Sequence, residues 1–186
     1  MKYEDPDLKP IYILDNEYPI DRSVLLREYE NHRANMTTIK QGDYGVSAED
    51  VLGKGVIDDN VGESYTPYMI NTPVVNEFTE KFIDHYKIPY NYTTVFFKID
   101  AGGTLGWHRD LHDSSIVCNF ILTESRAPVE FWNVGEFHYK SAILDVQWVH
   151  RILNDNNPRL IYRITLSGKD CTYENLMRHI KSNVHN

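Results

Sequence analysis

The sequence has few cysteines and no long apolar segment, and these absences exclude several classes of protein. Only two cysteines are present, Cys118 and Cys171, and they lie far apart without the close spacing of a zinc site. A disulfide-rich scaffold is therefore excluded, and we expect a buried free thiol at Cys118, which lies within the apolar run SIVCNFIL. No apolar run is long enough to span a bilayer, so we expect no membrane partner.

Basic residues are also scarce. The chain has 19 Lys and Arg against 27 Asp and Glu, which gives a formal net charge of −8. Surfaces that bind nucleic acid need an excess of positive charge, so we expect no nucleic-acid partner. The first ten residues, MKYEDPDLKP, are acidic and lack the apolar centre of a secretory signal, so we expect a cytoplasmic location. Nothing in the sequence indicates the oligomeric state.

The sequence contains helical patterns in its N-terminal half, followed by strand-like patterns. Its 186 residues are enough for one domain. Residues 1–91 are expected to form a helical flank with helices over 19–33 and after Thr72, and residues 172–182 a C-terminal helix. Residues 41–67 are rich in Gly, Asp and Ser, so we expect an irregular segment and a possible lid over a site.

Residues 92–167 show about seven short β-like runs, most of them separated by turn signals: YTTVFFKI, TLGWHRD, SIVCNFIL, VEFW, EFHY, AILDV and RLIYRITL. Helices followed by closely spaced strands are typical of a mainly β, α+β fold, in which a sandwich or barrel carries a helical flank.

The segment GWHRDLHDSS concentrates candidate ligands. In a strand, alternate side chains share a face, so His108 and Asp110 point one way while Trp107 points the other. An imidazole and a carboxylate on one face form two arms of a metal site. His112 and Asp113 are expected in a solvated turn after this strand. The pair alone is a weak signal, because such triplets are common.

A second segment, LDVQWVHRILNDNNPRLIYRITL, adds His150. This histidine would complete a set of two histidines and one carboxylate, which binds Fe(II) and leaves positions open. Arg159 and Arg163 share one face of the following strand, and a guanidinium is suited to a carboxylate ligand. The pattern also fits the opposite arrangement, in which the apolar face of this strand meets the core and both arginines face water.

The order His108-x-Asp110, Asp145, His150, Asn154, Arg159 resembles the 2-oxoglutarate/Fe(II)-dependent dioxygenases over roughly residues 92–166. It is similar to the aspartyl/asparaginyl β-hydroxylase type and to the small bacterial proline hydroxylases. The resemblance implies a double-stranded β-helix (a jelly-roll, cupin-like barrel) with the N-terminal helices packed on one sheet.

The resemblance also implies roles for individual residues. His108, Asp110 and His150 would hold Fe(II), and Arg159 would bind the distal carboxylate of 2-oxoglutarate, with Arg163 as the reserve candidate. With molecular oxygen, such enzymes convert 2-oxoglutarate to succinate and hydroxylate a substrate. The substrate class implied is a small amino-acid-like molecule or a peptidyl side chain.

Further polar and aromatic residues are candidates for the pocket. Asn119 is the polar residue of an apolar run, and its burial would require a partner. The residues expected to flank the cavity are Trp107, Trp132 and Trp148, with Asn154 either in a turn or near the substrate. Asp145 either ends a strand or orients a ligand.

Two other functions remain open from the sequence. A cupin-like protein would use the same metal ligands for non-oxidative chemistry and would not depend on Arg159. A jelly roll without metal would use His108 and His150 as ordinary polar residues.

Overall fold

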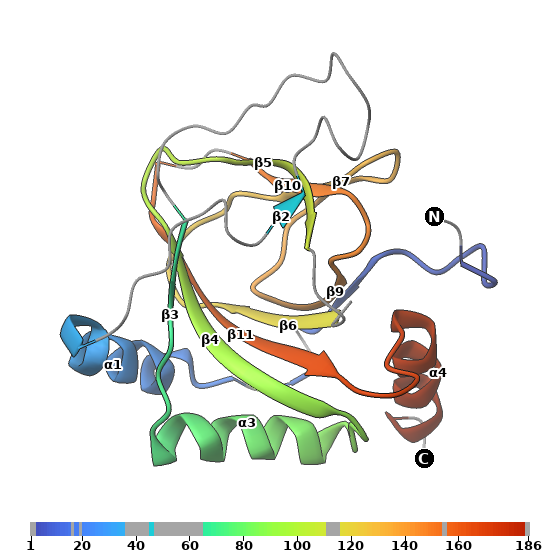
Figure 1. Cartoon of the computed structure of the whole chain (residues 1–186), viewed down its shortest axis with the longest axis horizontal. Coiled ribbons are helices and arrows are strands. Elements are labelled where there is room, and N and C mark those ends of the chain that lie inside the picture. Colours follow the sequence, from blue (N-terminus) through green and yellow to red (C-terminus); the bar gives the residue numbers. More distant parts are fainter. Residues whose placement is uncertain are drawn as a thin grey trace.

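The computed structural model describes residues 3–15, 17–18, 20–35, 45–46, 65–110, 116–153 and 156–184. Within them, two antiparallel sheets face each other, and helices cover the outer side of the larger sheet (Figure 1). The six-stranded sheet has the order β1 (Ile11–Ile13), β9 (Ser141–Asp145), β6 (Ile116–Ile121), β11 (Arg159–Ser167), β4 (Asn91–Ile99) and β3 (Tyr65–Tyr68). The five-stranded sheet has the order β2 (Gly45–Val46), β5 (Leu105–Asp110), β10 (His150–Ile152), β7 (Val129–Phe131) and β8 (Gly135–Phe137).

The helices lie where the sequence patterns place them. They are α1 (Arg22–His32), followed by the 3-10 turn η1 (Arg33–Asn35), then α3 (Pro73–His85) and α4 (Tyr173–Val184). Figure 1 shows α1 and α3 along the outer face of the larger sheet, with α4 beside the end of β11. The expected mainly β barrel with N-terminal helices packed on one sheet is confirmed. Among the described residues, every helix is too short or too polar to span a bilayer.

The larger sheet separates two apolar cores because both of its faces are covered. Along β11, Leu160, Tyr162, Ile164 and Leu166 pack in a cluster with residues of α1, α3 and α4. Ile161 lies on the opposite face, in a second cluster between the two sheets. Arg159 shares that interior face and is only 2% exposed. Each of the two arrangements left open for β11 is therefore half right: its apolar face meets a core, but Arg159 and Arg163 lie on the interior face between the sheets and do not face water.

Some strands were not expected from the sequence. The segment 41–67 contains β2 and the first residues of β3, so it is not irregular throughout. The other residues of this expected lid segment, 41–44 and 47–64, lie outside the described residues. β10 has three residues, too few to show an alternating pattern. Cys118 and Cys171 are both free and buried, which confirms the expectation for Cys118.

Thr72 begins α3 and connects it to α1. Its hydroxyl accepts a hydrogen bond from the Val75 amide (3.3 Å) and donates one to a Glu28 carboxylate oxygen (2.7 Å). Because the Thr72→Ala variant loses this N-cap, we expect the free energy of unfolding to fall by about 1 kcal/mol. Urea denaturation measures the change. Thr72→Ser keeps the hydroxyl and should remain near wild type; equal stability of the Ala variant would contradict the capping role.

Candidate metal centre

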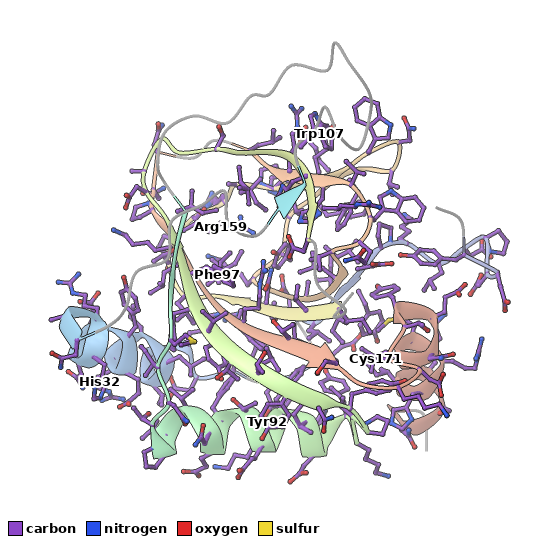
Figure 2. All side chains as sticks on the ribbon, viewed as in Figure 1. His32, Tyr92, Phe97, Trp107, Arg159 and Cys171 are labelled. Atoms are coloured by element: carbon purple, nitrogen blue, oxygen red, sulfur yellow. The ribbon has the colours of Figure 1, made fainter. Side chains whose placement is uncertain are left out.

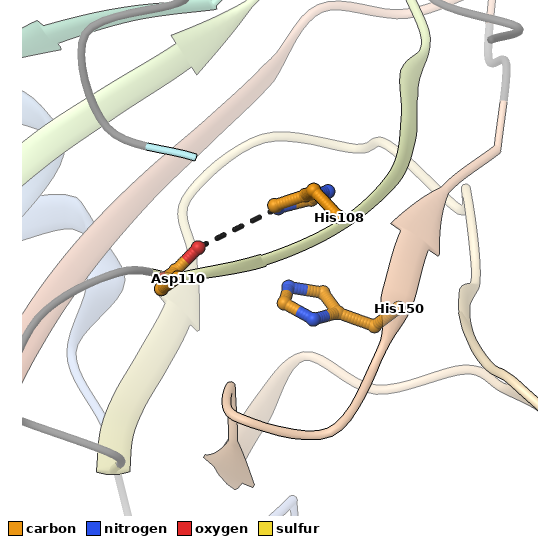
Figure 3. A group of neighbouring side chains, drawn as sticks. All are labelled: His108, Asp110 and His150. Carbon is orange, nitrogen blue, oxygen red and sulfur yellow. Dashed lines mark ion pairs between the residues drawn. The ribbon is translucent and has the colours of Figure 1, made fainter. Parts of the chain in front are cut away.

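Strands β5 and β10 bring His108, Asp110 and His150 together. The two strands are antiparallel neighbours, and the Cα atoms of His108 and His150 are direct partners in the register. The imidazole centroids lie 4.3 Å apart, and His108 Nε2 lies 3.6 Å from Asp110 Oδ1. One ligand-type atom from each residue lies within 4.8 Å of the others, and Figure 3 shows the three side chains converging. This spacing is compatible with one shared metal ion.

The two histidines are held in the same way. His108 Nδ1 donates to the carbonyl oxygen of Gly106 (2.7 Å), and His150 Nδ1 donates to that of Trp148 (2.9 Å). A carbonyl oxygen only accepts hydrogen bonds, so each neutral ring carries its proton on Nδ1. In that neutral form each Nε2 keeps a lone pair, as a metal ligand requires.

Burial and neighbouring charges favour the ligand forms of these groups. Burial, with His108 close by, lowers the pKa of His150 to about 3, so its imidazole is neutral near pH 7. Burial alone would raise the pKa of Asp110, but the Arg163 guanidinium and the two imidazoles outweigh it, and this pKa lies below its ordinary value. The site thus presents a carboxylate and, at His150, a neutral nitrogen donor.

Arg163 is already engaged within the barrel. Its Nη1 lies 3.2 Å from Asp110 Oδ2, and its Nε donates to Asn119 Oδ1 at 3.0 Å. Asn119, 3% exposed, also donates through Nδ2 to the Tyr139 hydroxyl at 3.3 Å. Asn119 is therefore buried with hydrogen-bond partners, Arg163 and Tyr139, as its burial was expected to require. Sequence reasoning misses Tyr139, because it ends a strand-like run without a distinctive pattern.

Arg159 differs from Arg163 because most of its guanidinium has no partner. Nη1 donates to the Ala127 carbonyl oxygen, and the group lies 5.2 Å from the centroid of the Tyr139 ring. Nε and Nη2 are buried and have no hydrogen-bond partner among the described residues. Figure 2 shows Arg159 between the two sheets. A buried, largely unpaired cation is costly, so the arrangement favours an anionic ligand at this place.

The tryptophans do not gather around the triad. Trp107 alternates with His108 and lies on the other face of β5, where the Arg151 guanidinium covers its ring at 4.5 Å. Trp132, 37% exposed, meets Trp107 edge to face at 5.1 Å. Only Trp148 packs against the apolar cluster between the sheets. The structure therefore places Trp107 and Trp132 outside the interior that they were expected to flank.

Asp145 is the last residue of β9, and its side chain is hydrogen-bonded to neighbouring parts of the chain. Its carboxylate accepts hydrogen bonds from the Tyr3 hydroxyl (2.8 Å) and the Gln147 amide (3.0 Å), and neither bond reaches a triad histidine. The Gln147 side chain in turn donates to the Asp110 carbonyl oxygen at 2.6 Å. Asp145 thus stabilises the turn that supports the end of β5. Asn154, His112 and Asp113 lie outside the described residues.

No model of a known protein family and no curated sequence matches the chain. Solved structures do match, and they define its fold as the double-stranded β-helix found in prolyl hydroxylases. The fold implied by the resemblance to the 2-oxoglutarate/Fe(II)-dependent dioxygenases is thereby confirmed.

Three of these structures are informative. A Pseudomonas putida prolyl-4-hydroxylase has a TM-score of 0.55 at 9% identity, covering 86% of this chain and 93% of its own. The viral collagen prolyl hydroxylase of Paramecium bursaria Chlorella virus-1, as its 2OG complex, has a TM-score of 0.52 at 13% identity, covering 88% and 98%. A prolyl hydroxylase from Trichoplax adhaerens, in complex with a hypoxia-inducible-factor peptide, has a TM-score of 0.55 at 9% identity, covering 94% and 87%.

Proposed function

We propose that the protein is a 2-oxoglutarate- and Fe(II)-dependent dioxygenase that hydroxylates a C–H bond of a small amino-acid-like molecule or a peptidyl side chain. One observation carries the proposal: a triad of two histidines and one aspartate and a buried, largely unpaired arginine face the same barrel interior. The fold shared with prolyl hydroxylases, one of them bound to 2OG and another to a peptide, supports it.

The donor set fits the proposed metal. Two imidazole nitrogens and one carboxylate oxygen are the set that non-haem Fe(II) oxygenases use, and they leave positions open for other ligands. In the proposed arrangement His108 and His150 bind through Nε2, because each Nδ1 is used by a backbone carbonyl. Asp110 binds through Oδ1, the oxygen nearer to His108.

The protein's own residues provide binding, orientation and shielding. Bound Fe(II) would supply the oxidative chemistry, in which oxygen, 2-oxoglutarate and the C–H substrate give succinate, carbon dioxide and the hydroxylated product, with one oxygen atom entering succinate and the other the product. Arg159 would pair with the distal carboxylate of 2-oxoglutarate through its free N–H groups. Apolar side chains of both sheets, among them Phe97 and Phe131, exclude bulk water from the interior.

Anaerobic visible spectroscopy of the metal-stripped protein tests the proposal. We expect a charge-transfer band that requires both Fe(II) and 2-oxoglutarate. Fe(II) binding without any response to 2-oxoglutarate would favour a cupin-like protein with non-oxidative chemistry, and absence of metal binding would contradict both. With the band established, succinate formation in air with free L-proline and with a proline-containing peptide would compare the two substrate classes.

A further inference from the structure

We propose that Arg163, anchored by Asn119, is a positioning residue that restricts Asp110 to coordination through one oxygen. The proposal rests on the metal site of the proposed function. It assigns the two interior arginines of β11 different tasks: Arg159 would bind the co-substrate, whereas Arg163 would set the number of positions that the metal keeps open.

The two oxygens of Asp110 have different neighbours. Oδ1 lies 3.6 Å from His108 Nε2, the nitrogen through which His108 would bind the metal. Oδ2 lies 3.2 Å from Arg163 Nη1 and accepts a hydrogen bond from it. Because a guanidinium and a metal ion compete for the same lone pairs, the oxygen bound by Arg163 is withheld from the metal.

Arg163 is itself fixed from several sides. Asn119 is its cross-strand partner on β6 and accepts from its Nε at 3.0 Å. The Phe97 ring lies 4.2 Å from the guanidinium carbon, and the Tyr139 hydroxyl accepts from Asn119 on the other side. An anchored guanidinium loses little further freedom when it holds a carboxylate, so it can impose one orientation on Asp110.

The number of oxygens supplied by Asp110 decides how many positions remain. A carboxylate can bind a metal through one oxygen or through both. In six-coordination, two histidines and one oxygen leave three positions, whereas a second oxygen would leave two. A co-substrate that chelates through two atoms would then occupy every position left, with none for a further ligand.

The water-proton relaxation of the Mn(II)-loaded protein tests this role, because it reports how many exchangeable waters the metal holds. In Arg163→Met, Oδ2 is released, and we expect the number of metal-bound waters to fall by about one third. Arg163→Lys keeps one donor and should restore part of the wild-type value. Arg151→Met is the matched control: Arg151 follows His150 on β10 but pairs with Glu130 on the outer face.

Two results would separate the possible failures. An Arg163→Met protein that is folded and holds as many metal-bound waters as wild type would overturn the positioning role and leave the proposed function intact. A wild-type protein that binds no Mn(II) or Fe(II) would contradict the proposed function and this role with it. If Arg163→Met does not fold, Asn119→Ala, which removes only the anchor, should lower the water number in the same direction, and an unchanged number would overturn the role.

Discussion

Replacing His150 by alanine is expected to lower Fe(II) affinity by more than about 100-fold, the upper range for loss of a residue that merely supports a ligand. His150 is 4% exposed, and burial keeps its imidazole neutral, so it is ready to bind a metal without first losing a proton. The two remaining candidate ligands, His108 and Asp110, come from the same strand and span only one side of the site. An anaerobic Fe(II) titration measures the loss.

The control for this experiment is another histidine that also bonds a backbone carbonyl. His138 is exposed, and its Nδ1 lies 3.0 Å from the Arg126 carbonyl oxygen. His138→Ala should bind Fe(II) as wild type does. Circular dichroism should show that the His150 variant is folded, because loss of a buried ring also creates a cavity beside Phe131, whose centroid lies 5.7 Å away. A folded His150→Ala variant that binds Fe(II) with wild-type affinity would show that His150 is not a metal ligand.

Strand alternation makes part of the site predictable from the sequence. It places His108 and Asp110 on one face of their strand, and it places Arg159 and Arg163 together on one face of another. What alternation cannot give is register between distant strands. The pairing of His150 with His108 depends on β10, whose three residues leave no pattern in the sequence.

Arg159 and Arg163 also show that strand alternation alone cannot predict which side chains from other strands contact a residue. Their spacing on β11 gives them one face, and either guanidinium suits a carboxylate. Only packing distinguishes them, since Asn119 and Asp110 reach Arg163 while Nε and Nη2 of Arg159 stay unpaired among the described residues. These partners come from other strands, so no local pattern in the sequence identifies them.

Trp107 shows a conflict within the sequence itself. Alternation places its side chain opposite His108, whereas its closeness to the ligands suggests the pocket. The structure follows alternation, and the Trp107 ring packs against Arg151 and Trp132 instead. Strand geometry is therefore a better guide to which side chains face the barrel interior than nearness in sequence.

Arg159→Met is expected to weaken 2-oxoglutarate binding and to stabilise the ligand-free protein at the same time. The charge-assisted hydrogen bonds of a guanidinium contribute about 1.5–3 kcal/mol each, so we expect the Kd for 2-oxoglutarate to rise by about 100-fold. Without the ligand, the buried cation has unpaired N–H groups, and an apolar side chain there should raise the free energy of unfolding by about 1 kcal/mol.

Two measurements on one variant separate these effects. Titration of the Fe(II)-loaded protein under anaerobic conditions gives the Kd through the charge-transfer band, and urea denaturation of the metal-free protein gives the stability. Arg126→Met is the control, since Arg126 precedes Ala127 but is exposed, and it should change neither quantity. Wild-type affinity in Arg159→Met, with the loss appearing in Arg163→Met instead, would transfer the co-substrate role to Arg163. If the free energy of unfolding falls rather than rises, the Arg159 guanidinium stabilises the ligand-free fold. That result would remove the argument for an anionic ligand at Arg159, because the argument depends on the unpaired cation being costly when no ligand is bound.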